Sequence, residues 1–178
     1  MMTTMKTIFA RRSYRGPYLP EPVSRQDLRL MMEAGLDAPS GCNKQTCSLI
    51  AVDDPELMQR LLAVMDPPVG ETAPACICVL TQRVVAYGDK CYAVQDYAAA
   101  IENILLAATS MGYASCWYEG HVTDEDGLGR KMADILDVPE DYELVCFLPI
   151  GKPAERVRPV SKKAFAERAW FNGFHANS

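Results

Sequence analysis

The stretch from Asp96 to Met111 constrains the fold of this chain more than any other part of the sequence. Its spacing predicts a helix with apolar or small residues on nearly every face, chiefly Ala98–Ile101 and Ile104–Ala108. A helix that is apolar all round must be covered on all sides, so we expect a central helix packed against a sheet. Asn103 interrupts this surface, and backbone groups are its expected hydrogen-bond partners.

Periodicity and turn residues predict the other elements. Ser24 can cap a helix together with Asp27. The further helices are expected to begin at Ser24, at Asp54-Pro55 and at Thr123, the last of them ending at Leu136. The expected strands are Ser48–Val52, Ala75–Leu80, Tyr113–Tyr118 and Glu143–Ile150. Strands interleaved with helices predict an α/β sandwich in which helices flank a mixed central sheet.

The length and composition are those of a single globular domain. Of the 178 residues, 49% are hydrophobic and 23% charged, so we expect one domain over residues 1–178. No apolar run reaches membrane-spanning length, and Met1–Phe9 lacks the apolar region of a signal peptide. We therefore expect a cytoplasmic protein that binds neither membranes nor nucleic acid.

The seven cysteines do not form a pattern typical of disulfides or metal sites. Their number is odd, they are scattered, and no C-x-x-C occurs. With only His121 and His175 as histidines, no metal-ligand spacing is present, and we expect no metal. His121 is interpreted as polar surface. Reduced core thiols are expected, with Cys42 as the one candidate for exposure.

Positive charge is concentrated near the two ends of the chain. Ten of the 18 lysines and arginines lie in two short segments, although the net charge is -5. They are Lys6, Arg11, Arg12, Arg15, Lys152, Arg156, Arg158, Lys162, Lys163 and Arg168. Arginine forks and a hydroxyl such as that of Ser13 suit a phosphate, which accepts several charge-assisted hydrogen bonds. The alternatives are an anion site that joins both ends and a solvated basic surface.

Four blocks of sequence support the first of these alternatives. They are ARRSYR at 10–15, APSGCNKQ at 38–45, DYAAAIENILLAATSMGYASCWYEG at 96–120, and VCFLPIGKP at 145–153 followed by Lys162-Lys163. In this order they resemble the nitroreductase family of FMN-dependent oxidoreductases over nearly the whole chain. The resemblance implies an α+β homodimer in which the tail of each subunit, residues 154–178, wraps the partner and adds to its sheet. The tail's unexplained large aromatics fit this picture; they are Phe165, Trp170, Phe171 and Phe174.

The resemblance also implies an FMN site. The phosphate contacts match Arg11, Ser13, Arg15 and Lys162 or Lys163, and Arg12 matches a contact to the ribityl chain or the pyrimidine edge. Pro39, Ser40 and Asn43, with Gln45 in a less defined role, match a block that reaches the flavin of the other subunit. Glu119 and Gly120 match the place where a backbone N–H meets flavin N5. Gly151 and Lys152 end a strand beside the cofactor, and Trp117 with Cys116 and Tyr118 either lines the ring slot or belongs to the core.

The implied function is hydride transfer from NADH or NADPH, through flavin N5, to a nitroaromatic, quinone or other conjugated acceptor by a ping-pong mechanism. No side chain is expected to act as acid, base or nucleophile, because the flavin carries the chemistry. The alternatives are another reaction on the same fold, such as reductive dehalogenation or flavin breakdown, and a flavin-binding redox module without turnover. Two departures from the family stand out. Leu61–Gly70 offers no polar contact to the pyrimidine edge, and the short segment between Leu80 and Asp96 predicts an open site or one roofed by the partner.

Overall fold

The structure is a computed structural model that describes residues 3–119, 122, 125 and 127–174. The helices in this part of the chain are α1 (Thr4–Ala10), α2 (Arg25–Leu36), α3 (Pro55–Ala63), α4 (Ala93–Ser110) and α5 (Leu128–Ile135), with short 3-10 turns η1 (Gly41–Asn43) and η2 (Phe165–Glu167). The strands are β1 (Cys47–Val52), β2 (Ala75–Thr81), β3 (Val85–Tyr87), β4 (Lys90–Cys91) and β5 (Glu143–Ile150).

A three-stranded sheet in the order β1-β2-β5 forms the centre of the molecule. Every residue of β2 is buried, which explains its apolar run from Ala75 to Leu80. Both pairings of this sheet are antiparallel, so the expectation of a mixed sheet needs correction. Among the described residues, parallel pairing enters only as the isolated bridge between Ser13 and Ser115.

The segment Tyr113–Tyr118 is not the strand that we expected. Its residues form single bridges with three different partners: Ala114 with Gly151, Ser115 with Ser13, and Tyr118 with Phe147. A continuous ladder needs one neighbour that runs alongside the whole segment. Here the neighbour changes along the segment, so the extended chain instead ties together parts of the molecule that are distant in sequence.

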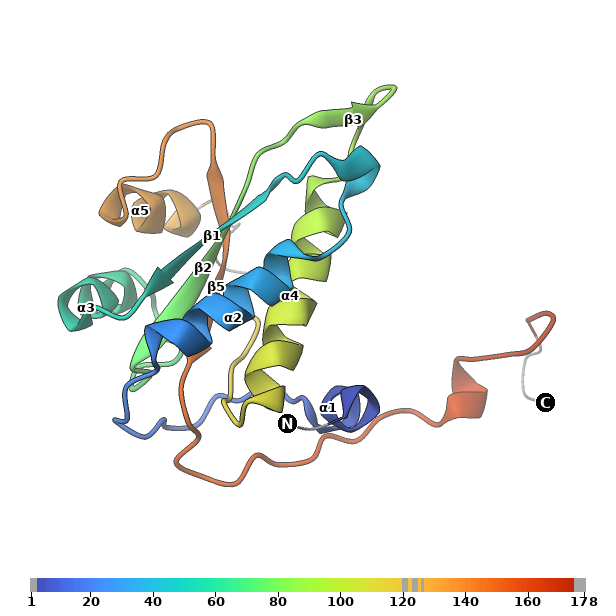
Figure 1. The fold of residues 1–178 in the computed structure, drawn as a ribbon, viewed down its shortest axis with the longest axis horizontal. Helices are drawn as coiled ribbons and strands as arrows, with labels where there is room; N and C mark the ends of the chain where they lie inside the picture. Colours follow the sequence, from blue (N-terminus) through green and yellow to red (C-terminus); the bar gives the residue numbers. More distant parts are fainter. Residues whose placement is uncertain (1–2, 120–121, 123–124, 126, 175–178) are drawn as a thin grey trace.

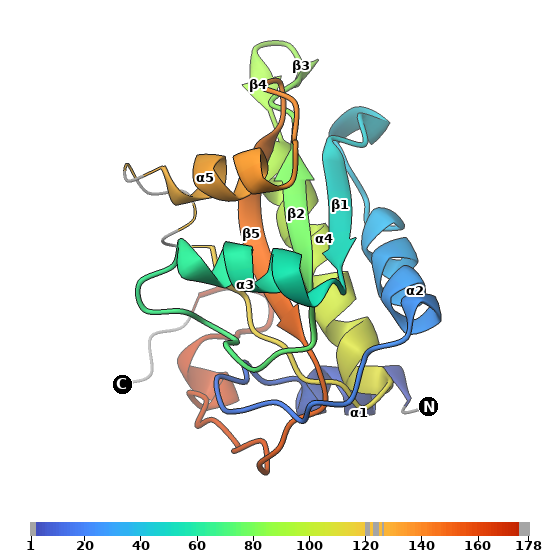
Figure 2. The same ribbon diagram turned by 90° about the vertical axis from the view of Figure 1, so that its left-hand side faces the viewer.

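Helices cover both faces of the sheet, as the predicted sandwich requires. On one face, α2 and α4 pack against Ile77, Val79 and Leu148, whereas α3 and α5 pack on the other face against Cys78 and Phe147. Figures 1 and 2 show α2 and α4 on one side of the sheet and α3 and α5 on the opposite side. Side chains from both faces of the same strands therefore enter two separate cores.

The predicted starts of the helices agree with the structure to different degrees. The Ser24 side chain accepts a hydrogen bond from the Asp27 N–H at 3.0 Å, which confirms the predicted cap of α2. Asp54 caps α3 in the same way, through the Leu57 N–H at 2.9 Å. Helix α4 begins three residues before Asp96, at Ala93. Helix α5 begins at Leu128, later than predicted, because the preceding Gly127 adopts a left-handed conformation with φ of 71°; Thr123 and Asp126 lie outside the described residues.

The tail after Ile150 carries exposed aromatic side chains. Phe165 and Phe171 are 65% and 77% exposed, and Phe174 is 75% exposed. They stack on other tail residues, with ring centroids 6.1 Å apart for Phe165–Phe171 and 4.3 Å apart for Trp170–Phe174. Figure 1 shows the tail passing beneath α1 and then leaving the body of the molecule. In the part of the chain that the structure covers, no helix combines the length and apolarity needed to cross a bilayer.

Candidate functional site

Three of the four sequence blocks meet beside the end of α4. The Tyr14 N–H donates to the Ser115 carbonyl at 2.9 Å, and the Ala114 N–H donates to the Gly151 carbonyl at 2.8 Å. The Lys152 carbonyl in turn accepts from the Leu19 N–H at 2.9 Å. The structure therefore places the arginine block, the segment after α4 and the end of β5 side by side, as the resemblance implies.

Two buried donors, one in the arginine block and one in the segment bridged to it, lack protein partners. Arg12 Nη1 donates to the carbonyls of Phe9 and Arg11, both at 2.7 Å, whereas its Nε is buried without a partner. The buried hydroxyl of Ser115, across the bridge from Ser13, has no partner either. Within the described chain these are two of three such atoms, the third being Trp170 Nε1. Buried polar atoms are normally hydrogen-bonded, so this pair points to a polar ligand.

The other cations of the block have different surroundings. Arg11 is half-buried, and its Nε lies 3.2 Å from Glu102 Oε1 on α4. Arg15 and Ser13 are exposed. Burial raises the pKa of the Cys116 thiol to about 11. The positive charge of the nearby Arg15 opposes part of this rise. Cys116 therefore stays a neutral thiol near pH 7 and offers no nucleophile.

Gly151 and the lysines are placed as follows. A side chain at Gly151 would bring Cβ within 2.7 Å of Pro74 Cδ and 2.8 Å of Tyr18 Cδ1, so packing within the protein already requires glycine. Lys152 Nζ lies 2.5 Å from the Glu21 carboxylate. Lys162 and Lys163 are exposed on the tail. Sequence reasoning missed the Glu21 pairing because nothing local links residues so far apart.

A second polar cluster lies at the far end of the segment that follows α4. Trp117 Nε1 donates to Glu119 Oε2 at 2.6 Å, and the Tyr97 hydroxyl donates to Glu119 Oε1 at 2.8 Å. Burial is the larger cause, and the hydrogen bond to Glu119 the next, of a raised pKa of Tyr97. Its hydroxyl therefore stays protonated and remains a donor. Trp117 is half-buried beside the core on the α4 face of the sheet. Gly120 and His121 lie outside the described residues.

The block at 38–45 forms a tight loop that α4 holds in place. The Asp96 carboxylate, only 5% exposed, accepts from the Gly41 N–H at 2.7 Å and from the Thr46 hydroxyl at 2.8 Å. The Ser40 hydroxyl accepts from the Gln45 N–H at 3.0 Å. The loop backbone has positive φ at three non-glycine residues, Cys42 (50°), Asn43 (54°) and Gln45 (51°), which is uncommon and typical of functional loops.

Sequence reasoning did not identify Asp96 as the anchor of this loop. The sequence feature that could have identified it is the position of Asp96, an acidic residue in an otherwise apolar helix. Asn103 was interpreted correctly as structural, since its Nδ2 donates to the Ala34 carbonyl at 3.0 Å and joins α4 to α2.

The loop at 38–45 and the arginine block lie toward opposite ends of α4 (Figure 1). Asp96 belongs to the first turn of this helix, whereas Ser13 is bridged to Ser115, beyond its last turn. A helix of 18 residues spans about 27 Å at about 1.5 Å per residue. Within one subunit the two blocks are therefore far apart.

The short segment between β2 and α4 folds into the hairpin β3–β4, next to η1. Tyr87 on this hairpin is 71% exposed. Cys91 is exposed as well, so Cys42 is not the single exposed cysteine that we expected; all seven cysteines are free. Among the described residues, no group of three or more His, Cys, Asp or Glu side chains could hold a metal ion.

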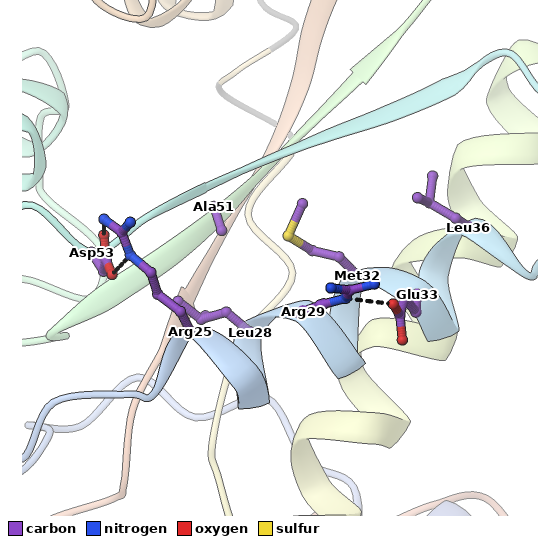
Figure 3. A pocket seen from close by; sticks show the side chains of 8 residues that line it. All are labelled: Arg25, Leu28, Arg29, Met32, Glu33, Leu36, Ala51 and Asp53. Carbon is purple, nitrogen blue, oxygen red and sulfur yellow. Dashed lines mark hydrogen bonds and ion pairs between the residues drawn. The ribbon is translucent and has the colours of Figure 1, made fainter.

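A groove of about 550 Å³ lies apart from the arginine block, between α2 and β1. Figure 3 shows Leu28, Met32 and Ala51 along it, and the ion pairs Arg25–Asp53 and Arg29–Glu33. None of the residues that line this groove carries an unpartnered buried donor. We therefore assign the candidate site to the place where the three sequence blocks meet, and not to this groove.

Comparisons with known proteins agree with this arrangement. Residues 8–66 and 66–152 match the nitroreductase family. A protein from Archaeoglobus fulgidus named NADH dehydrogenase/NAD(P)H nitroreductase is 29% identical over 158 residues, covering 87% of this chain and 88% of its own length. The structure of a Bacteroides fragilis nitroreductase with bound FMN superimposes with a TM-score of 0.78 at 28% identity, covering 96% of this chain and 99% of that one.

An FMN-dependent nitroreductase from Clostridium difficile gives a TM-score of 0.80 at 25% identity, with the same two coverages of 96% and 99%. The family match spans most of the chain and, apart from the end of the fourth block, includes the three blocks that the fold brings together. The chain therefore belongs to the nitroreductase family.

Proposed function

We propose that the protein is an FMN-dependent oxidoreductase that uses NADH or NADPH to reduce a nitroaromatic, quinone or other conjugated acceptor. Two similar solved structures carry FMN in their names, and the Archaeoglobus relative carries NAD(P)H. The single observation that carries the proposal is the pair of buried, unpartnered donors, Arg12 Nε in the arginine block and Ser115 Oγ in the segment bridged to it.

The donor set of this site fits FMN. Arg11, Ser13 and Arg15 supply two cations and a hydroxyl for the phosphate, and a fork-shaped guanidinium suits its oxygens. Lys162 or Lys163 adds a further cation from the tail. The unpartnered Arg12 Nε suits a hydroxyl oxygen of the ribityl chain or a carbonyl oxygen of the pyrimidine edge, which would satisfy a buried donor that otherwise costs free energy.

The extended segment after α4 suits the rest of an elongated cofactor. It runs from Ser115, at the phosphate end, to Glu119, whose backbone together with that of Gly120 would present an N–H to N5 of the ring. When bound, FMN accepts a hydride at N5 from NAD(P)H and passes it to the acceptor. The protein's part is to hold the rings in contact and to exclude water, with Trp117 contributing a wall of the slot. Accordingly, no side chain is assigned as acid, base or nucleophile.

We further propose a homodimer in which both subunits build each site. Pro39, Ser40 and Asn43 belong to the loop that Asp96 holds at the first turn of α4, whereas Ser13 is bridged to Ser115 beyond its last turn, so a second copy is the source that lets them contact the same cofactor. Exposed apolar rings support this assembly. Of the five phenylalanines, Phe147 is fully buried, whereas the other four are at least 65% exposed, including Phe9 at 66%. Such surface normally marks an interaction site.

The groove between α2 and β1 suits the tail of the second copy. β1 is an edge strand, so one side of its backbone is open for further pairing. Beside it, Met32 and Leu36 offer apolar surface to an incoming aromatic side chain (Figure 3). The tail residues Phe165 and Phe171 are exposed in their own subunit and would be covered there. Adding a strand in this way joins backbone pairing with pockets for alternate side chains.

The absorption spectrum of the purified protein tests the central proposal. A flavin enzyme is yellow, bleaches under anaerobic NADH or NADPH, and recovers its colour when an acceptor such as a quinone is added. A flavin-binding module without turnover would stay yellow. A colourless protein that takes up no added FMN would show that the proposal is wrong.

A further inference from the structure

Glu119 is held by its side chain as well as by its backbone. Its two carboxylate oxygens each accept a hydrogen bond, Oε2 from Trp117 Nε1 at 2.6 Å and Oε1 from the Tyr97 hydroxyl at 2.8 Å. Its carbonyl accepts from the Val122 N–H at 2.8 Å. The donors come from both sides of the residue, because Trp117 belongs to the same extended segment and Tyr97 to α4.

Both donors are themselves fixed. Tyr97 is 3% exposed in the core on the α4 face of the sheet. Trp117 stands next to Tyr118, whose carbonyl accepts from the Phe147 N–H of β5 at 2.9 Å. The Glu119 carboxylate therefore connects the segment after α4 to the helix, and the neighbouring Tyr118 carbonyl connects the same segment to the sheet. A short charge-assisted bond to a rigid donor restricts the atoms that follow it along the chain.

We propose that Trp117 and Tyr97 are positioning residues, which fix the backbone of Glu119 toward the flavin ring through their hydrogen bonds to its carboxylate. This inference rests on the proposed function, in which the Glu119 and Gly120 backbone meets N5. A contact to the reacting atom must be held within a fraction of an ångström to be effective. The backbone bonds of Tyr118 and Glu119 already hold this segment, and the two bonds to the carboxylate add a constraint from the side chain.

Variants of Glu119 can separate the positioning role of its two hydrogen bonds from the effect of its negative charge on the flavin, because the two donors differ in what they can bind. An indole N–H can only donate, whereas a phenol can donate or accept. In Glu119→Gln the amide oxygen can still accept from Trp117, and the amide N–H can donate to a reoriented Tyr97 hydroxyl. This variant removes the charge but keeps both bonds. Glu119→Ala removes both bonds, and Tyr97→Phe removes one without changing the shape of the core.

The experiment compares wild type, Tyr97→Phe, Glu119→Gln, Glu119→Ala and the double variant Tyr97→Phe/Glu119→Ala, all loaded with FMN. The readouts are FMN content, the flavin absorption spectrum, its midpoint potential and the rate of flavin reduction in a stopped-flow instrument. Tyr97→Phe should slow flavin reduction roughly threefold to tenfold, the effect of losing about one hydrogen bond, and shift the spectrum and potential. Glu119→Gln should recover most of the rate lost in Glu119→Ala.

Coupling between the residues is the sharpest measure. In the Glu119→Ala background, Tyr97→Phe should add almost nothing, since its partner is already gone. Tyr113→Phe is the matched control, because this hydroxyl also donates to a carboxylate, that of Asp27 at 2.7 Å, but lies away from Glu119. It should leave the flavin readouts as in wild type.

Two outcomes would overturn the inference in distinguishable ways. If loaded Tyr97→Phe matches wild type in spectrum, potential and rate, or if its effect simply adds to that of Glu119→Ala, the bonds do not position the flavin contact. If wild type itself takes up no FMN, the proposed function fails and this inference fails with it. The FMN content of wild type, read first, tells these cases apart.

Discussion

The buried carboxylate of Asp96 accepts a hydrogen bond from the backbone N–H of Gly41 at 2.7 Å. Its second oxygen accepts from the Thr46 hydroxyl at 2.8 Å, so one side chain of α4 spans the two ends of a loop with three positive-φ residues. A backbone in this region is costly for residues other than glycine and needs support from its surroundings. Asp96 provides that support for the block that we assign to the partner's cofactor.

Asp96→Asn should therefore weaken both the fold and the cofactor site. The amide can accept from the Gly41 N–H and donate to the Thr46 hydroxyl, but both bonds lose the charge of the carboxylate, and a hydrogen bond to a charged group contributes about 1.5–3 kcal/mol against about 0.5–1.5 kcal/mol for a neutral one. We expect a lower melting temperature and weaker FMN binding, measured by calorimetry and by fluorescence titration. Asp89→Asn, at an exposed position of the hairpin, is the control. If the Asp96→Asn protein is less stable but binds FMN with normal affinity, the loop does not contribute to the cofactor site.

The arginine block gives a second prediction. Replacing Arg11 and Arg15 together by alanine should remove FMN but leave a folded dimer, because neither side chain belongs to the hydrophobic core. Each lost charge-assisted bond costs about 1.5–3 kcal/mol, so affinity should fall at least roughly tenfold. Arg60→Ala/Arg130→Ala is the matched control, since these two exposed arginines lie on α3 and α5, on the opposite face of the sheet from α4. If the titration gave equal affinities for both double variants, Arg11 and Arg15 would not belong to the site.

Local patterns in the sequence were sufficient for elements that a local property determines. The strand Glu143–Ile150 was predicted with the bounds that it has, because a buried strand is an unbroken apolar run. The cap at Ser24 was identified because it joins residues three apart. The segment Tyr113–Tyr118 was wrongly predicted as a strand, since its apolar residues show that it is extended and buried but not which neighbours it pairs with.

The candidate site divides in the same way. Its blocks were recognisable from a resemblance, and the fold brings three of them together. The contacts that give the site its shape were not predictable, because each joins polar groups that are distant in sequence, as in Tyr97 with Glu119 or Asp96 with Gly41. When a polar residue lies on a helix that is otherwise apolar and buried, the periodicity of the sequence does not indicate which distant residue it contacts.

The tail gives a third prediction. Truncation after Lys163 should leave the core of each subunit folded but weaken the dimer, because the tail aromatics are exposed in their own subunit. Burial of such a ring contributes about 1.5–3 kcal/mol before the cost of ordering the tail. FMN binding should weaken in parallel if the site is shared. Sedimentation that showed an intact dimer with a full complement of flavin would contradict the wrapped tail.

The kinetic order of the reaction gives the last prediction. The segment between β2 and α4 holds little more than the hairpin Val85–Cys91, which offers little material for a second substrate compartment. One pocket on one face of the ring cannot hold a nicotinamide and an aromatic acceptor together, so the oxidised nucleotide should leave before the acceptor binds. Initial rates over a matrix of NAD(P)H and quinone concentrations should then give parallel double-reciprocal lines. Intersecting lines would mean that both substrates occupy the site at once, which the single-pocket mechanism does not allow.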